Sequence, residues 1–506
     1  MKFKIRTILL WAIIGFLLIS STLIHAVCDW FNIRFGVSFE EILFTITSPL
    51  NGSDISFMSE VIEYVLPFII DTLLLFAVLL LLLIVLSFFI NIQLDVIIGK
   101  LKCCVNFSKI YQTICLISVL ATLCSSISYG VQSLHLGEYI ARKMDDTTIY
   151  EDYYINPNEI TITNNGNTKN IIYIYLESME TTYASTSVGG YQETNYIPHL
   201  TELAETNVSF SHNDALGGAN ITSGASWTMG ALFSSTTGVP FSLPIDGNSM
   251  NTFKNFAPGI TAFGDILEDQ GYNQVFLCGS DGNFGGRQNY FEQHGNYDVF
   301  DYYDMIDSGY IDENYYVWWG VEDYKLYDIA KTELLKLAKT NAPFNFTMLT
   351  VDTHHVDGYV CDNCSNTYDS QLPNVLECAD NQIYNFINWC KQQDFYDNTV
   401  IVITGDHFRM DSTLVDKASA ESGRRVYNCY INSSKKPIVS TQNRIFTTLD
   451  FFPTTLSAMG FEISGNRLGL GTDLFSGEKT LAEEFGFDAF NAELGKYSKY
   501  YEVNFE

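Results

Sequence analysis

Three side chains that suit a divalent cation follow two apolar segments of this chain. Glu177 comes directly after the run 170–176, and Asp406 and His407 come just after the run 399–404. Carboxylate oxygens and an imidazole nitrogen together form a plausible divalent-cation site. An acid after a strand can instead cap the next helix, which for Glu177 alone would be the better interpretation. The adjacent Asp-His pair on a separate strand favours the metal site.

A segment rich in hydroxyl groups and small residues, 220–232, leads into a predicted helix. A hydroxyl at a helix N-terminus gains from the helix dipole, which also stabilises a bound phosphate. Coordination to a metal would lower the pKa of such a hydroxyl and make it a nucleophile. On composition alone, a cluster of this kind is more often only a helix N-cap.

The segments that must position these side chains predict an α/β domain. Four apolar, β-branched runs are typical of strands buried on both faces, at 170–176, 274–278, 344–351 and 399–404. Helical patterns alternate with them, for example at 324–339 and 379–393. This alternation predicts a mainly parallel central sheet flanked by helices. In such sheets, sites form at the carboxyl ends of the strands, where Glu177 and Asp406 lie.

The charge of the chain is unevenly placed. The formal net charge is −30, yet the first 130 residues carry 7 basic and 8 acidic side chains, so nearly all of it lies further along. A domain this anionic repels nucleic acid, and we expect no DNA or RNA partner. An anionic substrate stays possible because local cations decide its binding.

Three long uncharged runs in the first 130 residues predict membrane-spanning helices at about 7–27, 70–91 and 110–130. The third run is less apolar and has a buried core helix as its alternative. The first could be a cleaved signal peptide, but His25-Ala26-Val27-Cys28 is a poor cleavage site, which favours an uncleaved anchor.

Basic residues near the spans predict the orientation. They stand before the first span and between the second and third, whereas the loop between the first two spans has only Arg34; the flanking residues are Lys2, Lys4, Arg6, Lys100, Lys102 and Lys109. Basic residues stay on the cytoplasmic side. We therefore expect a multi-pass protein of the plasma or inner membrane whose domain after residue 130 is extracytoplasmic.

Cysteine spacing leaves two interpretations open. Cys361-x-x-Cys364 could be half of a zinc site, but no second pair at ribbon spacing follows. Outside the cytoplasm a disulfide that staples a loop is favoured. The partners cannot be chosen from sequence among the cysteines of the external domain, which are Cys278, Cys361, Cys364, Cys378, Cys390 and Cys429.

Ordered motifs link the external domain to a known family. They are Tyr-Leu-Glu-Ser at 175–178, Thr-Ser-x-Ala at 222–225, Gly-Ser-Asp-x-x-Phe-Gly-Gly-Arg at 279–287, Asp-Thr-His-His at 352–355, Gly-Asp-His at 405–407 and Arg-Leu-Gly-Leu-Gly at 467–471. Through them, residues 168–480 resemble the sulfatase-like phosphoglycerol transferases of bacterial envelopes, in the alkaline phosphatase superfamily. These include lipoteichoic acid synthases and enzymes that decorate periplasmic glucans. The Phe-Gly-Gly-Arg and Asp-Thr-His-His forms are more like the glucan-decorating branch, which favours single-group transfer over polymer synthesis.

The resemblance implies a metal centre and a covalent mechanism. Glu177, Asp406 and His407 would bind one Mn²⁺ or Mg²⁺. Thr222 would complete the metal shell and attack the phosphodiester of phosphatidylglycerol, and the phosphoglycerol would then pass to an envelope glycan. The neighbouring hydroxyls of Ser223, Ser226 and Thr228 leave the identity of the nucleophile open.

The resemblance also implies substrate-binding residues. Arg287 falls on the arginine that binds phosphate, where a guanidinium suits the phosphoryl oxygens. His354 matches the histidine that would protonate the leaving oxygen or activate the acceptor, with His355 as the alternative. Trp227 could form a wall of the headgroup pocket, although a core aromatic is at least as good an interpretation.

Together these inferences divide the chain into a membrane anchor (1–130), a linker (131–168), a catalytic domain (169–490) and a tail (491–506).

The nearest rival function is phosphoethanolamine transfer on the same fold. A sulfatase fits less well because the segment at Thr222 lacks the Pro and Arg that follow a sulfatase nucleophile. An inactive sensor or glycan-binding module would not need the full set of predicted metal ligands.

Overall fold

The computed structural model describes residues 5–34, 56–89, 93–98, 101–164, 166, 168–242 and 256–505. The chain forms two compact units, one with residues up to Ile140 and the other with those from Ala141 onward. Each unit has its own packed interior.

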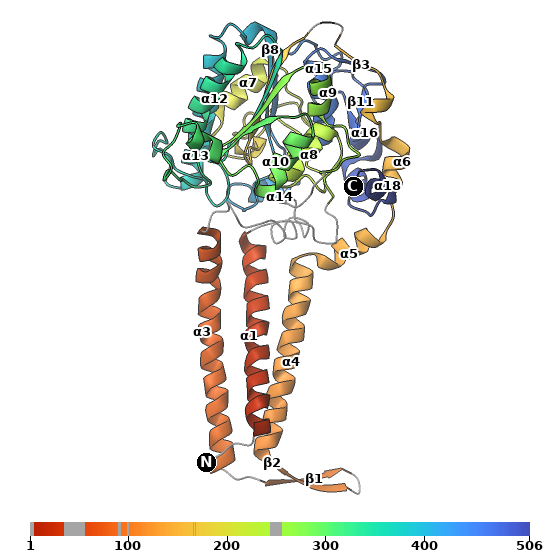
Figure 1. Cartoon of the computed structure of the whole chain (residues 1–506). Helices are drawn as coiled ribbons and strands as arrows, with labels where there is room; N and C mark the ends of the chain where they lie inside the picture. Colours follow the sequence, from red (N-terminus) through yellow and green to blue (C-terminus); the bar gives the residue numbers. More distant parts are fainter. Residues whose placement is uncertain are drawn as a thin grey trace. The chain divides into compact units, whose positions relative to one another are not determined.

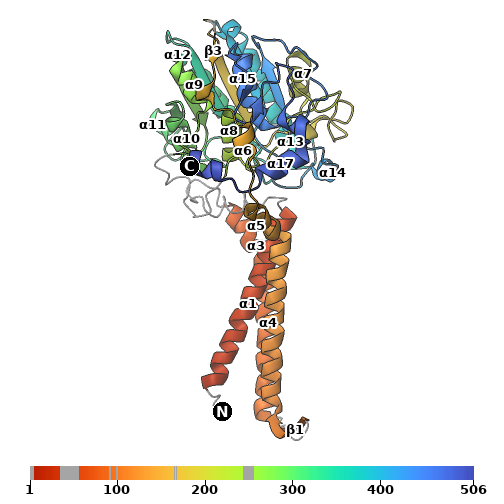
Figure 2. The same ribbon diagram turned by 90° about the vertical axis from the view of Figure 1, so that its right-hand side faces the viewer.

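The first unit contains three helices that are long and apolar enough to cross a membrane. They are α1 (Ile5–Arg34), α3 (Ser56–Ile84, continuing to Phe89) and α4 (Phe107–Ser133). The helices run side by side (Figure 1; Figure 2 shows α1 beside α4), and two hydroxyl pairs join them, Ser21 to Ser126 and Thr22 to Thr72, each at 2.8 Å. The three predicted spans match these helices. The predicted end of the second span at 90–91 lies outside the described residues.

A short antiparallel hairpin, β1 (Gln93–Ile98) and β2 (Leu101–Asn106), joins α3 to α4. The sequence analysis did not predict it. Lys2, Lys4 and Lys100, on which the predicted orientation depends, lie outside the described residues.

The second unit is built on a six-stranded sheet in the order β6-β5-β7-β4-β8-β9 (Figure 1). The strands are β4 (Asn170–Leu176), β5 (Asn273–Cys278), β6 (Asp298–Phe300), β7 (Phe344–Leu349), β8 (Thr399–Gly405) and β9 (Asn428–Ile431). All neighbours are parallel except β9, which runs antiparallel to β8. The predicted mainly parallel α/β sheet is confirmed, with its four predicted strands at its centre.

Both faces of the sheet are buried, as continuous apolar strands require. Along β4, Ile171, Tyr173 and Tyr175 belong to one apolar cluster, and Ile172 and Ile174 belong to the other. The first face is covered by α8 (Thr228–Thr237), α9 (Phe263–Asp269), α10 (Arg287–Gln293) and α15 (Phe451–Ala458). The second is covered by α7 (Pro198–Thr206), α12 (Asp323–Leu337) and α13 (Gln371–Cys390) (Figure 1).

The domain extends beyond the predicted catalytic segment at both ends. On the N-terminal side, α6 (Ile149–Tyr153) contributes Tyr150, which packs edge-on against Tyr501 and Phe505. Strand β3 (Ile162–Thr163) pairs with β10 (Glu462–Ile463). The predicted linker and tail therefore form part of the folded unit, because each supplies apolar side chains that the other covers.

The register between β4 and β8 sets the position of the predicted metal ligands. Leu176 pairs with Gly405 at the carboxyl ends of the two strands. Glu177 and Asp406 are the next residues of each strand, so both leave the sheet at the same point of its edge. Gly405 is needed there because a Cβ atom would lie 2.0 Å from the carbonyl oxygen of Met179.

Replacing Gly405 by alanine should therefore destabilise the domain by about 1–3 kcal/mol, because the strand end must shift to relieve the overlap. Thermal unfolding of the full chain in detergent would measure this. Gly137→Ala is the matched control, since no atom lies within 4 Å of its added Cβ and it stands inside helix α5 (Leu136–Met144). Equal melting temperatures for the two variants would contradict the predicted constraint.

Candidate metal and phosphoryl-transfer site

The predicted metal ligands come together at the carboxyl edge of the sheet. One ligand atom from each of Glu177, Asp406 and His407 lies within 4.8 Å of the others, and all three residues are buried. His407 Nε2 is 3.5 Å from Glu177 Oε1 and 3.4 Å from Asp406 Oδ2. The spacing suits a single ion.

Hydrogen bonds aim the His407 imidazole at this point. Its Nδ1 lies 2.8 Å from the carbonyl oxygen of Phe408, which can only accept, so Nδ1 carries a proton. In the neutral ring Nε2 then presents its lone pair to Glu177 and Asp406. A backbone carbonyl bonded to the other nitrogen is the usual support of a metal-binding histidine.

The two carboxylates are held by a tight shell of donors. Asp406 Oδ1 accepts from the backbone N–H groups of Ser178 and His407, both at 2.8 Å, whereas its buried Oδ2 has no hydrogen-bond partner among the residues that the structure describes. Glu177 Oε1 accepts from the hydroxyl of Ser178 at 2.6 Å. The hydroxyl of Thr353 donates to the Glu177 carbonyl at 2.5 Å. A buried carboxylate oxygen that accepts no hydrogen bond is a suitable ligand for a cation.

The electrostatics of the pair also suit a cation. Burial, followed by the charge of Glu177, raises the pKa of Asp406 to about 7. Burial raises the pKa of Glu177 as well. Charge interactions with His407 and His354 outweigh the effect of burial, so the pKa of Glu177 is lowered. A divalent cation binds the deprotonated groups and so removes the repulsion between them.

Besides Ser178, Thr228 brings a hydroxyl to this cluster. Its Oγ1 lies 3.3 Å from His407 Nε2 and 3.5 Å from Glu177 Oε2. Thr228 is the first residue of α8 and is partly exposed. It therefore stands at the positive end of a helix, where a phosphate is stabilised.

Thr222, the predicted nucleophile, makes no such contact. Its hydroxyl is buried and has no hydrogen-bond partner in the described part of the chain. Its carbonyl accepts from the N–H of Ala225 in a turn, and Gly224 in that turn has φ of +79°. This turn separates Thr222 from the start of α8, so the helix presents Thr228 to the metal ligands. The identity of the nucleophile stays a prediction, and the geometry favours Thr228.

Trp227 is a core residue in this structure. Its side chain is 3% exposed within the apolar cluster of the first sheet face and meets Phe241 edge-on at 6.1 Å. This placement favours its structural interpretation over a wall of the headgroup pocket.

A row of rings links the two predicted substrate residues Arg287 and His354. The Arg287 guanidinium lies 5.6 Å from the ring of Phe284, Phe284 lies 5.4 Å from Trp319, and Trp319 meets His354 at 4.8 Å. His355 stacks on His354 with ring centroids 4.0 Å apart. The sequence analysis assigned no role to Trp319, because no motif contains it.

Hydrogen bonds orient the side chains of Arg287 and His354. Arg287 Nη2 donates to Ser280 Oγ and to the Asp281 carbonyl, while its buried Nε has no partner among the described residues. His354 Nδ1 lies 2.6 Å from the His355 carbonyl and so donates to it. Burial lowers the pKa of His354 and outweighs the charge of Glu177, which raises it. The lowered pKa favours the neutral ring, whose Nε2 is basic.

A second layer of charges fixes the loops around the site. Arg409 is fully buried, pairs with Asp411 at 2.6 Å and donates to the Thr353 carbonyl at 2.9 Å. Its own N–H donates to Glu180, which also pairs with Arg424. This network connects the segment after β8 to those after β4 and β7.

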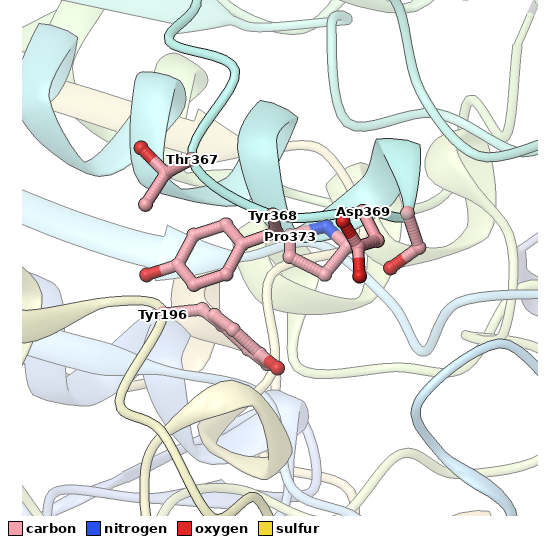
Figure 3. A pocket seen from close by; sticks show the side chains of 6 residues that line it. Tyr196, Thr367, Tyr368, Asp369 and Pro373 are labelled. Atoms are coloured by element: carbon pink, nitrogen blue, oxygen red, sulfur yellow. The ribbon is translucent and has the colours of Figure 1, made fainter.

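A pocket of about 450 Å³ lies between Tyr196 and the segment before α13. Tyr196 and Tyr368 face one another edge-on at 5.1 Å, with Asp369 and Pro373 beside them (Figure 3). None of the predicted site residues lines this pocket.

The geometry predicts that Asp406→Asn weakens Mn²⁺ binding by more than about 100-fold, because loss of supporting groups alone costs about 10–100-fold. Ser178→Ala should fall within that smaller range, since Ser178 only orients Glu177. Calorimetric titration of the full chain with Mn²⁺ would measure both. Asp416→Asn removes an exposed acid further along the chain, at the start of α14 (Asp416–Ala420), and should leave binding unchanged. Equal affinities for Asp406→Asn and this control would refute the site.

Comparisons with known proteins agree with this fold. The family model described as Sulfatase matches residues 169–461. Phosphoglycerol transferase I of Escherichia coli O127:H6 is 29% identical over 315 residues, 61% of this chain and 39% of the relative. The protein of the same name from Salmonella arizonae is 30% identical over 323 residues, 62% of this chain and 40% of the relative. The chain thus spans about two fifths of the length of these relatives.

A solved membrane protein shares the fold. The lipooligosaccharide phosphoethanolamine transferase A of Neisseria meningitidis superposes with a TM-score of 0.50 at 12% identity, over 89% of this chain and 84% of that one. At this identity the likeness concerns architecture alone. The matched family model covers more than half of the chain, and the chain belongs to the sulfatase family.

Proposed function

We propose that this chain transfers phosphoglycerol from phosphatidylglycerol to a cell-envelope glycan or glycolipid through a covalent intermediate on Thr228. One observation carries the proposal: a partly exposed hydroxyl at the start of α8 lies within 3.5 Å of both Glu177 and His407. The name phosphoglycerol transferase I of the curated relatives supports this choice of headgroup.

The residues present fit one divalent cation, which we infer to be Mn²⁺ or Mg²⁺. Glu177, Asp406 and His407 would hold it, and Thr228 would complete the set. When bound, the ion lowers the pKa of the threonine hydroxyl and offsets phosphoryl charge. The positive end of α8 acts in the same direction.

In the first half of the proposed reaction, Thr228 Oγ1 forms a bond to the phosphorus of the lipid headgroup. The bond between that phosphorus and the diacylglycerol oxygen breaks. His354 Nε2 takes the threonine proton and passes it to the departing oxygen, so diacylglycerol leaves neutral. Arg287 holds the phosphoryl oxygens, for which a guanidinium has matching geometry.

In the second half, an acceptor hydroxyl attacks the phosphorus of the phosphoglycerol-threonine. His354 takes the acceptor proton and returns it to Thr228 as the phosphorus–threonine bond breaks. The sum is one lipid and one acceptor converted to diacylglycerol and a phosphoglycerol-substituted acceptor, with the enzyme restored. His355, stacked on His354, would position it.

The membrane helices suit a lipid donor. The three candidate spans would tether the catalytic domain beside the donor and raise its effective concentration. The charge pattern of the loops supports an extracytoplasmic domain. There, a phospholipid is a sensible source of activated phosphoryl groups because nucleotides are absent.

Thr228→Ala should lower diacylglycerol release from labelled phosphatidylglycerol by at least about a thousandfold, because no other group then forms the intermediate. Thr228→Ser keeps a hydroxyl and should retain measurable activity, and Thr222→Ala should keep most of it. Mass spectrometry of a trapped adduct would locate the phosphoglycerol. An adduct on Thr222, or full activity of Thr228→Ala, would disprove the assignment.

The same assay with phosphatidylethanolamine tests the headgroup. We expect Mn²⁺-dependent diacylglycerol release from phosphatidylglycerol alone. Release from phosphatidylethanolamine alone would instead assign the chain to phosphoethanolamine transfer. Release from neither lipid would favour an inactive sensor or binding module.

A further inference from the structure

Three cysteines gather at a place that the proposed reaction does not use. Cys361 and Cys364 lie in the segment between β7 and α13, and Cys378 lies on α13. Cys361 Sγ is 3.6 Å from Cys364 Sγ and 3.7 Å from Cys378 Sγ, and Cys361 and Cys378 are buried. One sulfur from each lies within 4.8 Å of the others.

These distances distinguish a disulfide from a metal site. Sulfur atoms in a disulfide are about 2.05 Å apart. Around a tetrahedral zinc ion with Zn–S bonds of about 2.3 Å, neighbouring sulfurs lie about 3.8 Å apart. All three cysteines are free thiols in this structure, and so are the other cysteines whose side chains it describes. Three thiols that meet at the separation of metal ligands favour a metal site over the disulfide that the sequence favours.

A fourth ligand stands one helical turn after Cys378. The Gln382 side-chain nitrogen lies 3.2 Å from Cys378 Sγ and 3.6 Å from Cys361 Sγ, while its Oε1 is buried without a hydrogen-bond partner in the described part of the chain. The two ends of an amide are exchanged by a simple flip. The flip would place the oxygen beside the two sulfurs, where a tetrahedral site needs its fourth donor.

The order of these residues along the chain supports the same site. The pair Cys361-x₂-Cys364 is followed by 13 residues and then by Cys378-x₃-Gln382 on a helix. Structural zinc sites use a close pair on a loop and a second pair one turn apart on a helix, because positions i and i+4 share a helix face. The sequence analysis missed the second pair because it sought another Cys-x-x-Cys.

We propose that Cys361, Cys364, Cys378 and the Oε1 atom of Gln382 bind one structural Zn²⁺ ion. Thiolates are soft ligands that select zinc, whereas the hard oxygens at Glu177 and Asp406 suit Mn²⁺ or Mg²⁺. The three thiols lose their protons to solvent as the ion binds. The inference is independent of the proposed transfer reaction.

The ion would clamp the segment between β7 and α13 to that helix. This segment carries His354 before the cysteines and the pocket residues Thr367 and Tyr368 after them (Figure 3). Hydrogen bonds already fold it back on itself, from the Tyr359 N–H to the Asp352 carbonyl and from the Gln371 amide to the Gly358 carbonyl, both at 2.7 Å. Zinc would add a metal link between this segment and α13.

The full chain, purified in detergent with Zn²⁺ supplied and without chelators, should hold one zinc per molecule by elemental analysis. This zinc should persist in Asp406→Asn, which lacks the other site. Substitution with Co²⁺ should give thiolate-to-cobalt absorption in the near ultraviolet, which only the cysteine site can produce. The double variant Cys361→Ser/Cys378→Ser should lose both the zinc and the absorption.

Cys390→Ala is the control, since Cys390 is buried on the same helix but outside the cluster. It should keep the metal and the absorption. Peptide mapping of the unreduced wild type provides a readout that does not depend on any variant folding. A disulfide between any two of Cys361, Cys364 and Cys378 in the wild type would overturn the proposal. Absence of zinc from the Asp406→Asn variant would overturn it as well.

Discussion

The arrangement of the second unit depends on two carboxylates that the sheet buries side by side. The pairing of Leu176 with Gly405 brings Glu177 and Asp406 out of adjacent parallel strands at one point, with His407 next to them. Buried like charges are costly unless a cation or proton offsets them. The pKa of Asp406, raised to about 7 by burial and by Glu177, expresses that cost. A divalent cation at this point would offset the charge, and Thr228 lies beside two of the same three side chains.

Each element next to the sheet adds a side chain or a partial charge that the strands themselves do not supply. Helix α8 brings the Thr228 hydroxyl and its positive end to the cluster, because a turn at Gly224 redirects the chain before the helix begins. The segment after β5 supplies Arg287, and the segment after β7 supplies His354. Phe284 and Trp319 lie between these two side chains as a row of rings. The proposed zinc clamp would hold the last of these segments with ligands of a different chemical type.

Sequence alone predicted the parts that depend on periodicity and strand order. The continuous apolar runs located the four central strands, and the position of Glu177 and Asp406 after them indicated a shared edge. It could not decide between Thr222 and Thr228 as the proposed nucleophile, because that choice depends on where a helix starts within a segment full of hydroxyl residues. Trp227 could be pocket wall or core, and only packing against Phe241 distinguishes the two. The short edge strands β6 and β9 and the gathering of Cys378 with Cys361 depend on contacts far apart in sequence.

Anomalous diffraction from crystals of the full chain grown with Mn²⁺ would test the central claim most directly. We expect one manganese at the carboxyl edge of the sheet, about 2.0–2.2 Å from oxygens of Glu177 and Asp406 and from His407 Nε2, and closer to the Thr228 hydroxyl than to that of Thr222. A manganese bound elsewhere, or one closer to the Thr222 hydroxyl than to that of Thr228, would contradict the account.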